Sequence, residues 1–149
     1  MDISIAPFRP EDQAEAKSLV LAGLVGHWGW LDPTKNPDLE DIAAAYADGL
    51  FLVARQDGAL VGTGALLARS TEVAELVRMS VAVSLRRRGI GRSILHRLIV
   101  EAAARGFKRV VLETTQTWDE VVAFYLRNGF RLTHHAGGDA HFAFDLEPG

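Results

Sequence analysis

The chain has 149 residues, 48% of them hydrophobic, and a formal net charge of −3. Such a length suits a single domain, residues 1–149, with a packed core. The lack of cysteine excludes disulfides, cysteine-based metal sites and a cysteine nucleophile. The acidic balance disfavours a dedicated nucleic-acid binder. No apolar run has the length of a membrane span and no signal-peptide pattern is present, so a cytoplasmic protein with no membrane partner is expected.

The residue pattern in the first third of the chain predicts one strand and two helices. Residues 3–8 alternate as a short strand does. Residues 9–12 then open a helix, with proline and acidic residues in its first turn, which is predicted to run to about Leu24. The glycines and aromatic residues of 26–30 end that pattern. Asp38 is the predicted N-cap of a second helix, whose apolar positions are Leu39, Ile42 and Tyr46.

The middle of the chain is rich in strand patterns. Residues 51–55 and 60–67 are predicted to pair as a hairpin around Asp57-Gly58. Residues 73–83 form a further, mostly apolar strand that is expected to be central in the sheet. A helix follows and ends at Gly106. Its apolar residues recur at helical spacing on one face: Ile94, Leu95, Leu98, Ile99 and Ala102.

The last third adds strand, helix and hairpin. Residues 110–113 form a short buried strand and residues 119–128 an amphipathic helix closed by Gly129. Residues 130–134 and 141–146 are predicted to pair around a glycine-rich turn. The whole order describes an α/β domain with a mixed sheet.

The stretch Leu85 to Ile94, LRRRGIGRSI, follows the central strand and opens a helix. The first amides of a helix have no intrahelical partner, and Gly89 and Gly91 allow a ligand to approach the backbone. Neighbouring arginines supply guanidinium donors for phosphate oxygens. The pattern is neither a Walker loop, since no lysine follows Gly91, nor a dinucleotide fingerprint, since Ile94 replaces its third glycine. A diphosphate site is predicted, and a solvated basic turn is the alternative.

At these residues the chain resembles the GCN5-related N-acetyltransferase (GNAT) superfamily. Arg86 to Gly91 match that family's Gln/Arg-x-x-Gly-x-Gly/Ala signature, and Val122 to Phe130 match its C-terminal signature around a tyrosine and Gly-Phe. The resemblance covers nearly the whole chain. It implies a mixed, mostly antiparallel central sheet with splayed parallel strands four and five and helices on both faces.

The resemblance also implies that acetyl-CoA binds as co-substrate, without a metal. The strand backbone would pair with the pantetheine arm, an amide near Met79 or Ser80 would polarise the thioester carbonyl, and the turn would hold the diphosphate. The implied cofactor-binding residues are Met79, Ser80, Val81, Arg86, Arg87, Arg88, Gly89, Ile90, Gly91, Arg92 and Ser93. Trp118 stands where many relatives carry an asparagine that contacts the cofactor, so that contact is not implied here.

Three residues are candidates for acid and base. Tyr125 stands at the family's tyrosine and would protonate the departing thiolate, the alternative being a core aromatic. By resemblance Glu75 is the leading base, because it lies six residues before Val81, where histone-acetylating relatives carry a glutamate base. Strand alternation, barring a bulge, puts it on one face with Val77, Met79 and Val81. A solvated charge at the strand start is the alternative. Glu113 is the second candidate base, against a capping or ion-pair role.

By resemblance, the acceptor lies against the loop from residue 26 to 37 and the last hairpin. His27, Trp28 and Trp30 would give this loop an aromatic wall for a ring or an ammonium group. For Trp30, packing onto the core is favoured. The nearby histidines of the last hairpin (His134, His135 and His141) are interpreted as surface or acceptor-site residues rather than metal ligands.

Direct transfer of acetyl to a primary amine of a small molecule or peptide is therefore the predicted function. The alternative is a catalytically silent acyl-CoA-binding or sensing domain of the same fold. A nucleic-acid partner for the arginine run is disfavoured by the acidic balance and the lack of interleaved aromatic residues. Relatives often form homodimers, so a homodimer is expected by resemblance.

Overall fold

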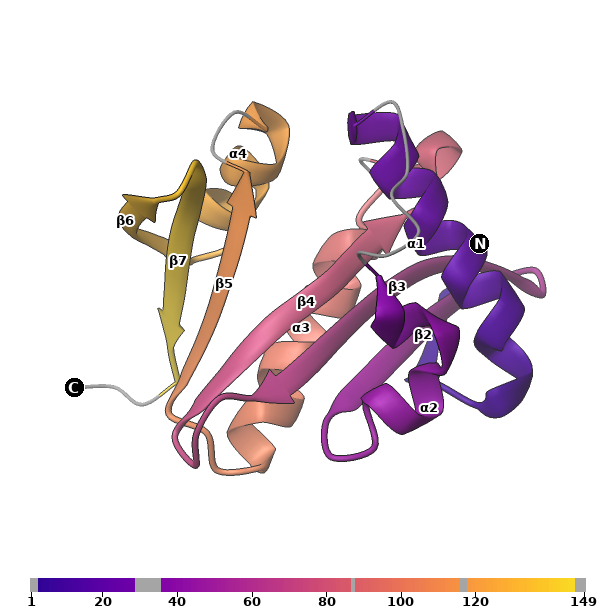
Figure 1. Ribbon diagram of the computed structural model, residues 1–149, viewed down its shortest axis with the longest axis horizontal. Coiled ribbons are helices and arrows are strands. Elements are labelled where there is room, and N and C mark those ends of the chain that lie inside the picture. The colour runs from indigo at the N-terminus through magenta and orange to yellow at the C-terminus, as the bar shows by residue number, and fades with distance from the viewer. Residues whose placement is uncertain (1–2, 29–35, 87, 116–117, 147–149) are drawn as a thin grey trace. The chain divides into compact units, whose positions relative to one another are not determined.

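The computed structural model describes residues 3–28, 36–86, 88–115 and 118–146 (Figure 1). The strand order is β1-β2-β3-β4-β5-β7-β6. β4 and β5 are parallel, whereas β1–β2, β2–β3, β5–β7 and β6–β7 are antiparallel. The predicted mixed, mostly antiparallel sheet with helices is confirmed. The chain divides into two compact units, Met1–Leu67 with Val77–Leu98 and Ala68–Leu76 with Ile99–Gly149, so β4 and α3 contribute to both.

The first unit places helical segments on both faces of its strands. The strands are β1 (Ile3–Pro7), β2 (Leu50–Gln56), β3 (Ala59–Ala68) and the end of β4 (Val73–Val81). The helical segments are η1 (Pro10–Asp12), α1 (Gln13–Trp28), η2 (Pro37–Glu40), α2 (Ile42–Ala45), η3 (Val83–Leu85) and the start of α3 (Ile90–Ala104). One buried cluster joins α1, η2 and α2 to β2 and β3: Ala16, Val20, Leu39, Ile42, Tyr46, Phe51, Val53, Leu60 and Ala65.

Helix α3 packs on the other face of β3, where two glycines leave room for it. A Cβ at Gly62 would lie 2.7 Å from Ile94 Cδ1, and a Cβ at Gly64 would lie 2.7 Å from both Ile94 Cγ2 and Met79 Sδ. Real carbon atoms do not approach so closely. The missing side chains therefore set how near the start of α3 comes to β3, and with it the turn that precedes α3.

Gly64→Ala should destabilise the protein by about 1–3 kcal/mol, because the added methyl group overpacks a closed core. Chemical denaturation of wild type and variant measures this difference. Ile94→Ala removes the atom that the new methyl group meets, so the double variant should lose less stability than the two single losses predict. Strict additivity would show that the contact with Ile94 does not cause the cost.

The second unit is built on β5 (Arg109–Thr115), flanked by the start of β4 and by β7 (Asp139–Asp145). β4 pairs with β5 through Val73 to Glu75 and Arg109 to Val111. β6 (Arg131–Ala136) lies at the edge, and α4 (Asp119–Arg127) carries Tyr125 into an aromatic cluster. The Tyr125 ring centroid is 5.2 Å from Phe124, 5.6 Å from Phe130 and 6.0 Å from Phe142.

Most predicted elements and turns are confirmed. Asp57 and Gly58 have φ angles of 53° and 85°, as a tight hairpin turn of this type requires, and Gly106 and Gly129 are left-handed after their helices. Two predictions near the N-terminus were wrong. α1 continues through Gly26 to Trp28, because an isolated glycine weakens a helix without ending it. Asp41, not Asp38, caps α2, and its side chain accepts from the Ala44 amide at 3.2 Å.

Candidate functional site

The turn between β4 and α3 has the geometry of an anion site. Gly89 is left-handed with a φ of 86°, and a Cβ placed there would meet nothing within 4 Å. The Ser93 amide and hydroxyl both donate to the Gly89 carbonyl at 3.0 Å. The amides of Ile90, Gly91 and Arg92 come before this first helical bond, so none has an intrahelical acceptor. They therefore form the positive end of α3.

Exposed guanidinium groups surround that turn. Arg86, Arg88 and Arg92 are all exposed, and Arg86 Nε donates to the Val81 carbonyl at 3.4 Å. Arg87, part of the same prediction, lies outside the described residues. Free amides, an open glycine and three exposed arginines together suit a phosphate-bearing ligand.

The end of β4 contradicts the predicted alternation. Val77 packs with the cluster under α1 and α2, whereas Met79 Sδ lies on the α3 side near Gly64. In a regular strand, side chains at positions i and i+2 point to the same face. Here Arg78, with a φ of 55°, turns the backbone through the left-handed region between them. The prediction that Glu75, Val77, Met79 and Val81 share one face is therefore wrong, because the strand is bulged.

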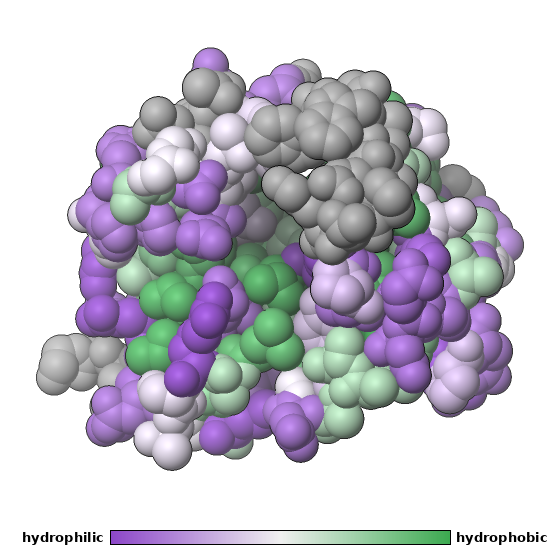
Figure 2. Space-filling model, viewed as in Figure 1, coloured by the Kyte–Doolittle hydropathy of each residue, from purple (hydrophilic) through white to green (hydrophobic). Residues whose placement is uncertain are grey.

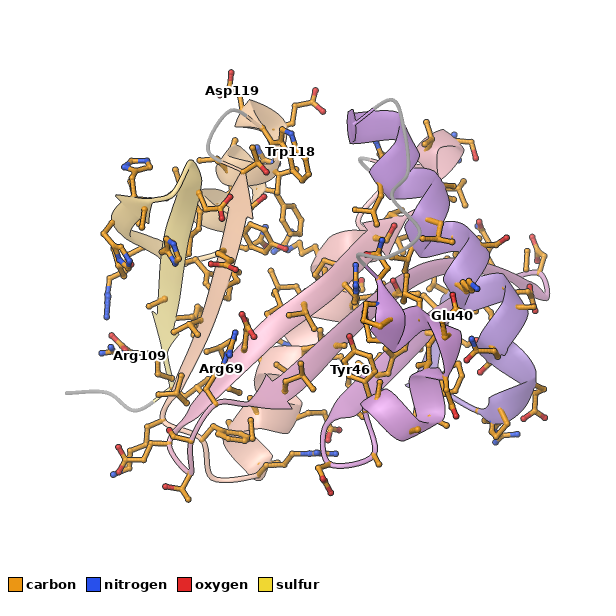
Figure 3. All side chains as sticks on the ribbon, viewed as in Figure 1. Glu40, Tyr46, Arg69, Arg109, Trp118 and Asp119 are labelled. Carbon is orange, nitrogen blue, oxygen red and sulfur yellow. The ribbon has the colours of Figure 1, made fainter. Side chains whose placement is uncertain are left out.

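In the second unit, Glu75 and Glu113 lie on the same face. Glu75 is the register partner of Val111, and Glu113 follows Val111 by two residues. Arg69, which follows β3 and is labelled in Figure 3, binds Glu75 Oε1 at 2.5 Å. Hydrogen bonding to Glu75 raises the pKa of Arg69 above its usual value, and the charge of Glu113 adds to the rise. No local sequence pattern singles out Arg69, because only the β3–β4 hairpin brings it to these carboxylates.

The two glutamates differ in exposure and partners. The side chain of Glu75 is 11% exposed and that of Glu113 is 51% exposed. Glu113 Oε2 is 3.6 Å from His141 Nδ1, and the His141 ring stacks on His134 at a centroid distance of 4.3 Å. Figure 2 shows a mixture of hydrophobic and hydrophilic side chains on the surface over β5. Glu113 is thus the carboxylate that solvent or an amine can reach.

Tyr125 lies against the opposite face of the second unit's strands. Its ring packs on Phe142, the register partner of Leu112, whereas His141 is the partner of Glu113. Neighbours in a strand point to opposite faces. Burial raises the pKa of Tyr125 above its ordinary value, so its hydroxyl stays protonated at neutral pH.

The predicted acceptor residues lie at the edge of the described residues or outside them. Trp30 lies outside the described residues, and His27 and Trp28 are described only as the last backbone positions of α1. Trp118 directly precedes α4 and donates its amide to the Thr115 carbonyl at 3.0 Å.

The described residues contain neither a candidate metal cluster nor a candidate membrane-spanning helix. Residues 3–28, 36–86, 88–115 and 118–146 contain no group of three or more histidine, aspartate or glutamate side chains that could hold a metal ion. Within the same part of the chain, no helix is long and apolar enough to cross a membrane.

Comparison with known proteins gives a consistent result. The Acetyltransferase (GNAT) family matches residues 18–130. The IAA acetyltransferase of Azospirillum brasilense is 39% identical over 105 residues, which are 68% of this chain and 68% of that protein. The chain spans about two thirds or less of the length of the curated relatives it matches.

Two solved structures share the fold at low sequence identity. A GNAT-family acetyltransferase from Staphylococcus aureus Mu50 superposes with a TM-score of 0.90 at 22% identity, covering 98% of this chain and 100% of the other. The PaiA N-acetyltransferase of Thermoplasma acidophilum, in complex with coenzyme A, gives a TM-score of 0.85 at 20% identity, covering 97% and 99%.

Proposed function

The chain belongs to the GNAT family of acetyltransferases, and on that premise we propose that it transfers the acetyl group of acetyl-CoA to a primary amine of a small molecule or peptide. One observation carries the proposal within this chain. The turn that opens α3 combines a left-handed, open Gly89 with free helix amides and exposed arginines. Such a turn suits a diphosphate, the most charged part of coenzyme A.

In the proposed complex the diphosphate binds the turn from residue 86 to Ser93. The backbone of Met79 to Val81 hydrogen-bonds the pantetheine arm as an added strand would. An amide of Met79 or Ser80 donates to the thioester carbonyl oxygen, which becomes negative when the amine attacks.

The reaction itself needs one base and one acid. The base removes a proton from the incoming ammonium, and the neutral nitrogen bonds to the carbonyl carbon. The nitrogen then loses its second proton to water as the carbon–sulfur bond breaks. Tyr125 gives its proton to the departing sulfur and afterwards regains one from solvent. Tyr125 and the two candidate bases lie on opposite faces of the second unit's strands, so separate groups are assigned the two proton transfers.

Among the candidate bases, the contacts favour Glu113. Glu75 is nearly buried and its Oε1 is engaged by Arg69, so we assign it the role of holding that arginine. Glu113 is half exposed and adjoins the imidazole of His141. It can therefore take a proton from an amine directly or through one water molecule.

Glu113→Gln should lower kcat/KM for the acceptor about tenfold, a modest loss because solvent reaches this carboxylate and can replace it. Glu75→Gln is the matched comparison, since it makes the same chemical change on the same face. Glu75→Gln should lower the melting temperature and leave kcat/KM for the acceptor near the wild-type value. The reverse pattern would make Glu75 the base.

The acceptor can be identified by following free thiol released from acetyl-CoA against a panel of primary amines. The panel should include aromatic amines, polyamines, amino acids and peptides with free N-termini. Thiol release that depends on one amine class supports the proposal. Calorimetric binding of acetyl-CoA with no turnover on any amine would instead identify a silent acyl-CoA-binding domain. Failure to bind acetyl-CoA would overturn both.

A further inference from the structure

One residue in the middle of β4 has a backbone conformation that its side chain disfavours. Arg78 has a φ of 55°, where the Cβ of an L-residue crowds its own carbonyl oxygen. Asp57 also has a positive φ, but its hairpin turn requires one. Nothing in a regular strand requires it at Arg78. Such a conformation persists only where surrounding groups hold it, and it is common at functional sites.

Three side chains from other segments of the first unit hold Arg78. Its guanidinium binds Asp38 of η2 through two bonds, Nε to Oδ2 at 2.9 Å and Nη2 to Oδ1 at 2.6 Å. The Tyr46 hydroxyl, at the end of α2, donates to Asp38 Oδ2 at 2.7 Å (Figure 3 labels Tyr46). The hydroxyl of Thr63, a fully buried β3 residue, donates to the Arg78 carbonyl oxygen at 2.8 Å.

The ion pair is strong enough to shift the titration of its acid. Burial alone would raise the pKa of Asp38, but hydrogen bonds from Arg78 and then Tyr46 hold it below its ordinary value. Asp38 is therefore charged at neutral pH and keeps both of its oxygens on the guanidinium.

The hydrogen bond from Thr63 fixes the direction of the Met79 amide as well as that of the Arg78 carbonyl. A peptide group is planar and trans, so the Arg78 carbonyl and the Met79 amide point in opposite directions from the same plane. When Thr63 holds the Arg78 oxygen towards β3, the Met79 N–H must point away from β3. An amide so directed can donate to a ligand lying along the side of β4 that faces away from β3. This singles out Met79, rather than Ser80, as the donor to the thioester.

We propose that Thr63 and the Asp38–Arg78 ion pair are positioning residues, which hold the Arg78–Met79 peptide so that the Met79 amide polarises the thioester carbonyl of bound acetyl-CoA. This inference rests on the proposed function. None of these three side chains is assigned a contact with the substrate. Thr63 sets the orientation of the Arg78–Met79 peptide group. The ion pair, to which Tyr46 adds a hydrogen bond, keeps Arg78 in the left-handed conformation that this orientation requires.

The test uses the full chain with acetyl-CoA carrying ¹³C at the carbonyl and needs no acceptor. Isotope-edited infrared spectroscopy measures the thioester carbonyl stretch, which moves to lower frequency when the oxygen accepts a hydrogen bond. Wild type should show this shift on binding. Thr63→Val, which replaces the hydroxyl with a methyl group of similar size, should lose most of the shift while the Kd for acetyl-CoA changes by less than about threefold, since the diphosphate contacts remain.

Thr63→Ser keeps the hydroxyl and should restore the shift, which a role in packing alone would not do. With an amine found in the acceptor screen, Thr63→Val should lower kcat about tenfold at unchanged KM for acetyl-CoA, as expected for a bond that strengthens in the transition state. Asp38→Asn is an independent second variant, which weakens the ion pair and should reduce the shift in the same direction.

The possible outcomes distinguish a failure of the proposed function from a failure of the positioning role. If wild type does not bind acetyl-CoA, the proposed function fails and this inference fails with it. If wild type binds but its carbonyl is unshifted, or if Thr63→Val keeps the full shift, the positioning role is wrong while the enzyme assignment survives. A stable Thr63→Val protein with a lost shift and a normal Kd supports the positioning role.

Discussion

Tyr125→Phe is expected to lower kcat at least about a hundredfold while leaving the Kd for acetyl-CoA unchanged. Only the hydroxyl is removed, and a positioned general acid contributes a factor of about 10² or more. The aromatic contacts with Phe130 and Phe142 survive because the ring remains. Steady-state kinetics with the best amine from the screen, together with calorimetry, measures both quantities.

The pH dependence of wild type follows from the burial of Tyr125. A general acid works while it is protonated, and burial raises the pKa of Tyr125 above its ordinary value of 10.0. Activity should therefore stay level between about pH 7 and 9 as far as this group is concerned. A fall in that range would need another titrating group.

Tyr125→Leu provides the comparison for a purely structural role. If Tyr125 were only a core aromatic, the phenylalanine variant would keep full activity and only the leucine variant, which loses the ring, would be impaired. Full activity of Tyr125→Phe with a good acceptor would thus remove the acid assignment.

Gly89→Glu is expected to weaken acetyl-CoA binding more than about a hundredfold. The substitution places a carboxylate where the diphosphate is proposed to bind, and it forces a residue with a Cβ into a φ of 86°. Open space around Gly89 means that a clash is not the cause. Calorimetric titration with acetyl-CoA measures the loss directly.

Gly58→Glu is a matched control for that experiment. Gly58 has a φ of 85° and, like Gly89, no atom within 4 Å of a built Cβ. It therefore carries the same backbone strain at the β2–β3 turn, outside the residues proposed to bind the diphosphate. It should cost similar stability and keep normal affinity. Equal loss of affinity in both variants would mean that strain, not the anion site, explains the effect.

Local patterns in the sequence were sufficient for much of this fold. Apolar spacing predicted the buried face of α3. Four of its five residues are buried and Ile99 is half-buried: Ile94, Leu95, Leu98, Ile99 and Ala102. Asp57-Gly58 predicted its hairpin. These features depend on neighbours within one element, which is the range over which periodicity and turn chemistry act.

Features that depend on distant segments could not be predicted in this way. Asp38 fits an N-cap pattern, yet its carboxylate binds Arg78, forty residues away. The bulge at Arg78 reverses the facing of every later residue of β4, and no residue type in that stretch signals it. Arg69 meets Glu75 only through the β3–β4 hairpin. The Asp38–Arg78 pair, the bulge in β4 and the Arg69–Glu75 pair all depend on how elements pack together, and not on the propensity of residues within one element.

Placement of the candidate acid and bases on opposite faces has a consequence for proton traffic. If Tyr125 is the acid and Glu113 the base, as proposed, the proton lost by the amine and the proton gained by the sulfur are handled on opposite faces of the second unit's strands. Glu113 can discharge to bulk water at its half-exposed side. Tyr125 is only 6% exposed, so as the proposed acid it would regain its proton with less access to solvent before the next cycle. Deuterated solvent should therefore slow the recovery of the resting enzyme more than it slows the capture of the amine.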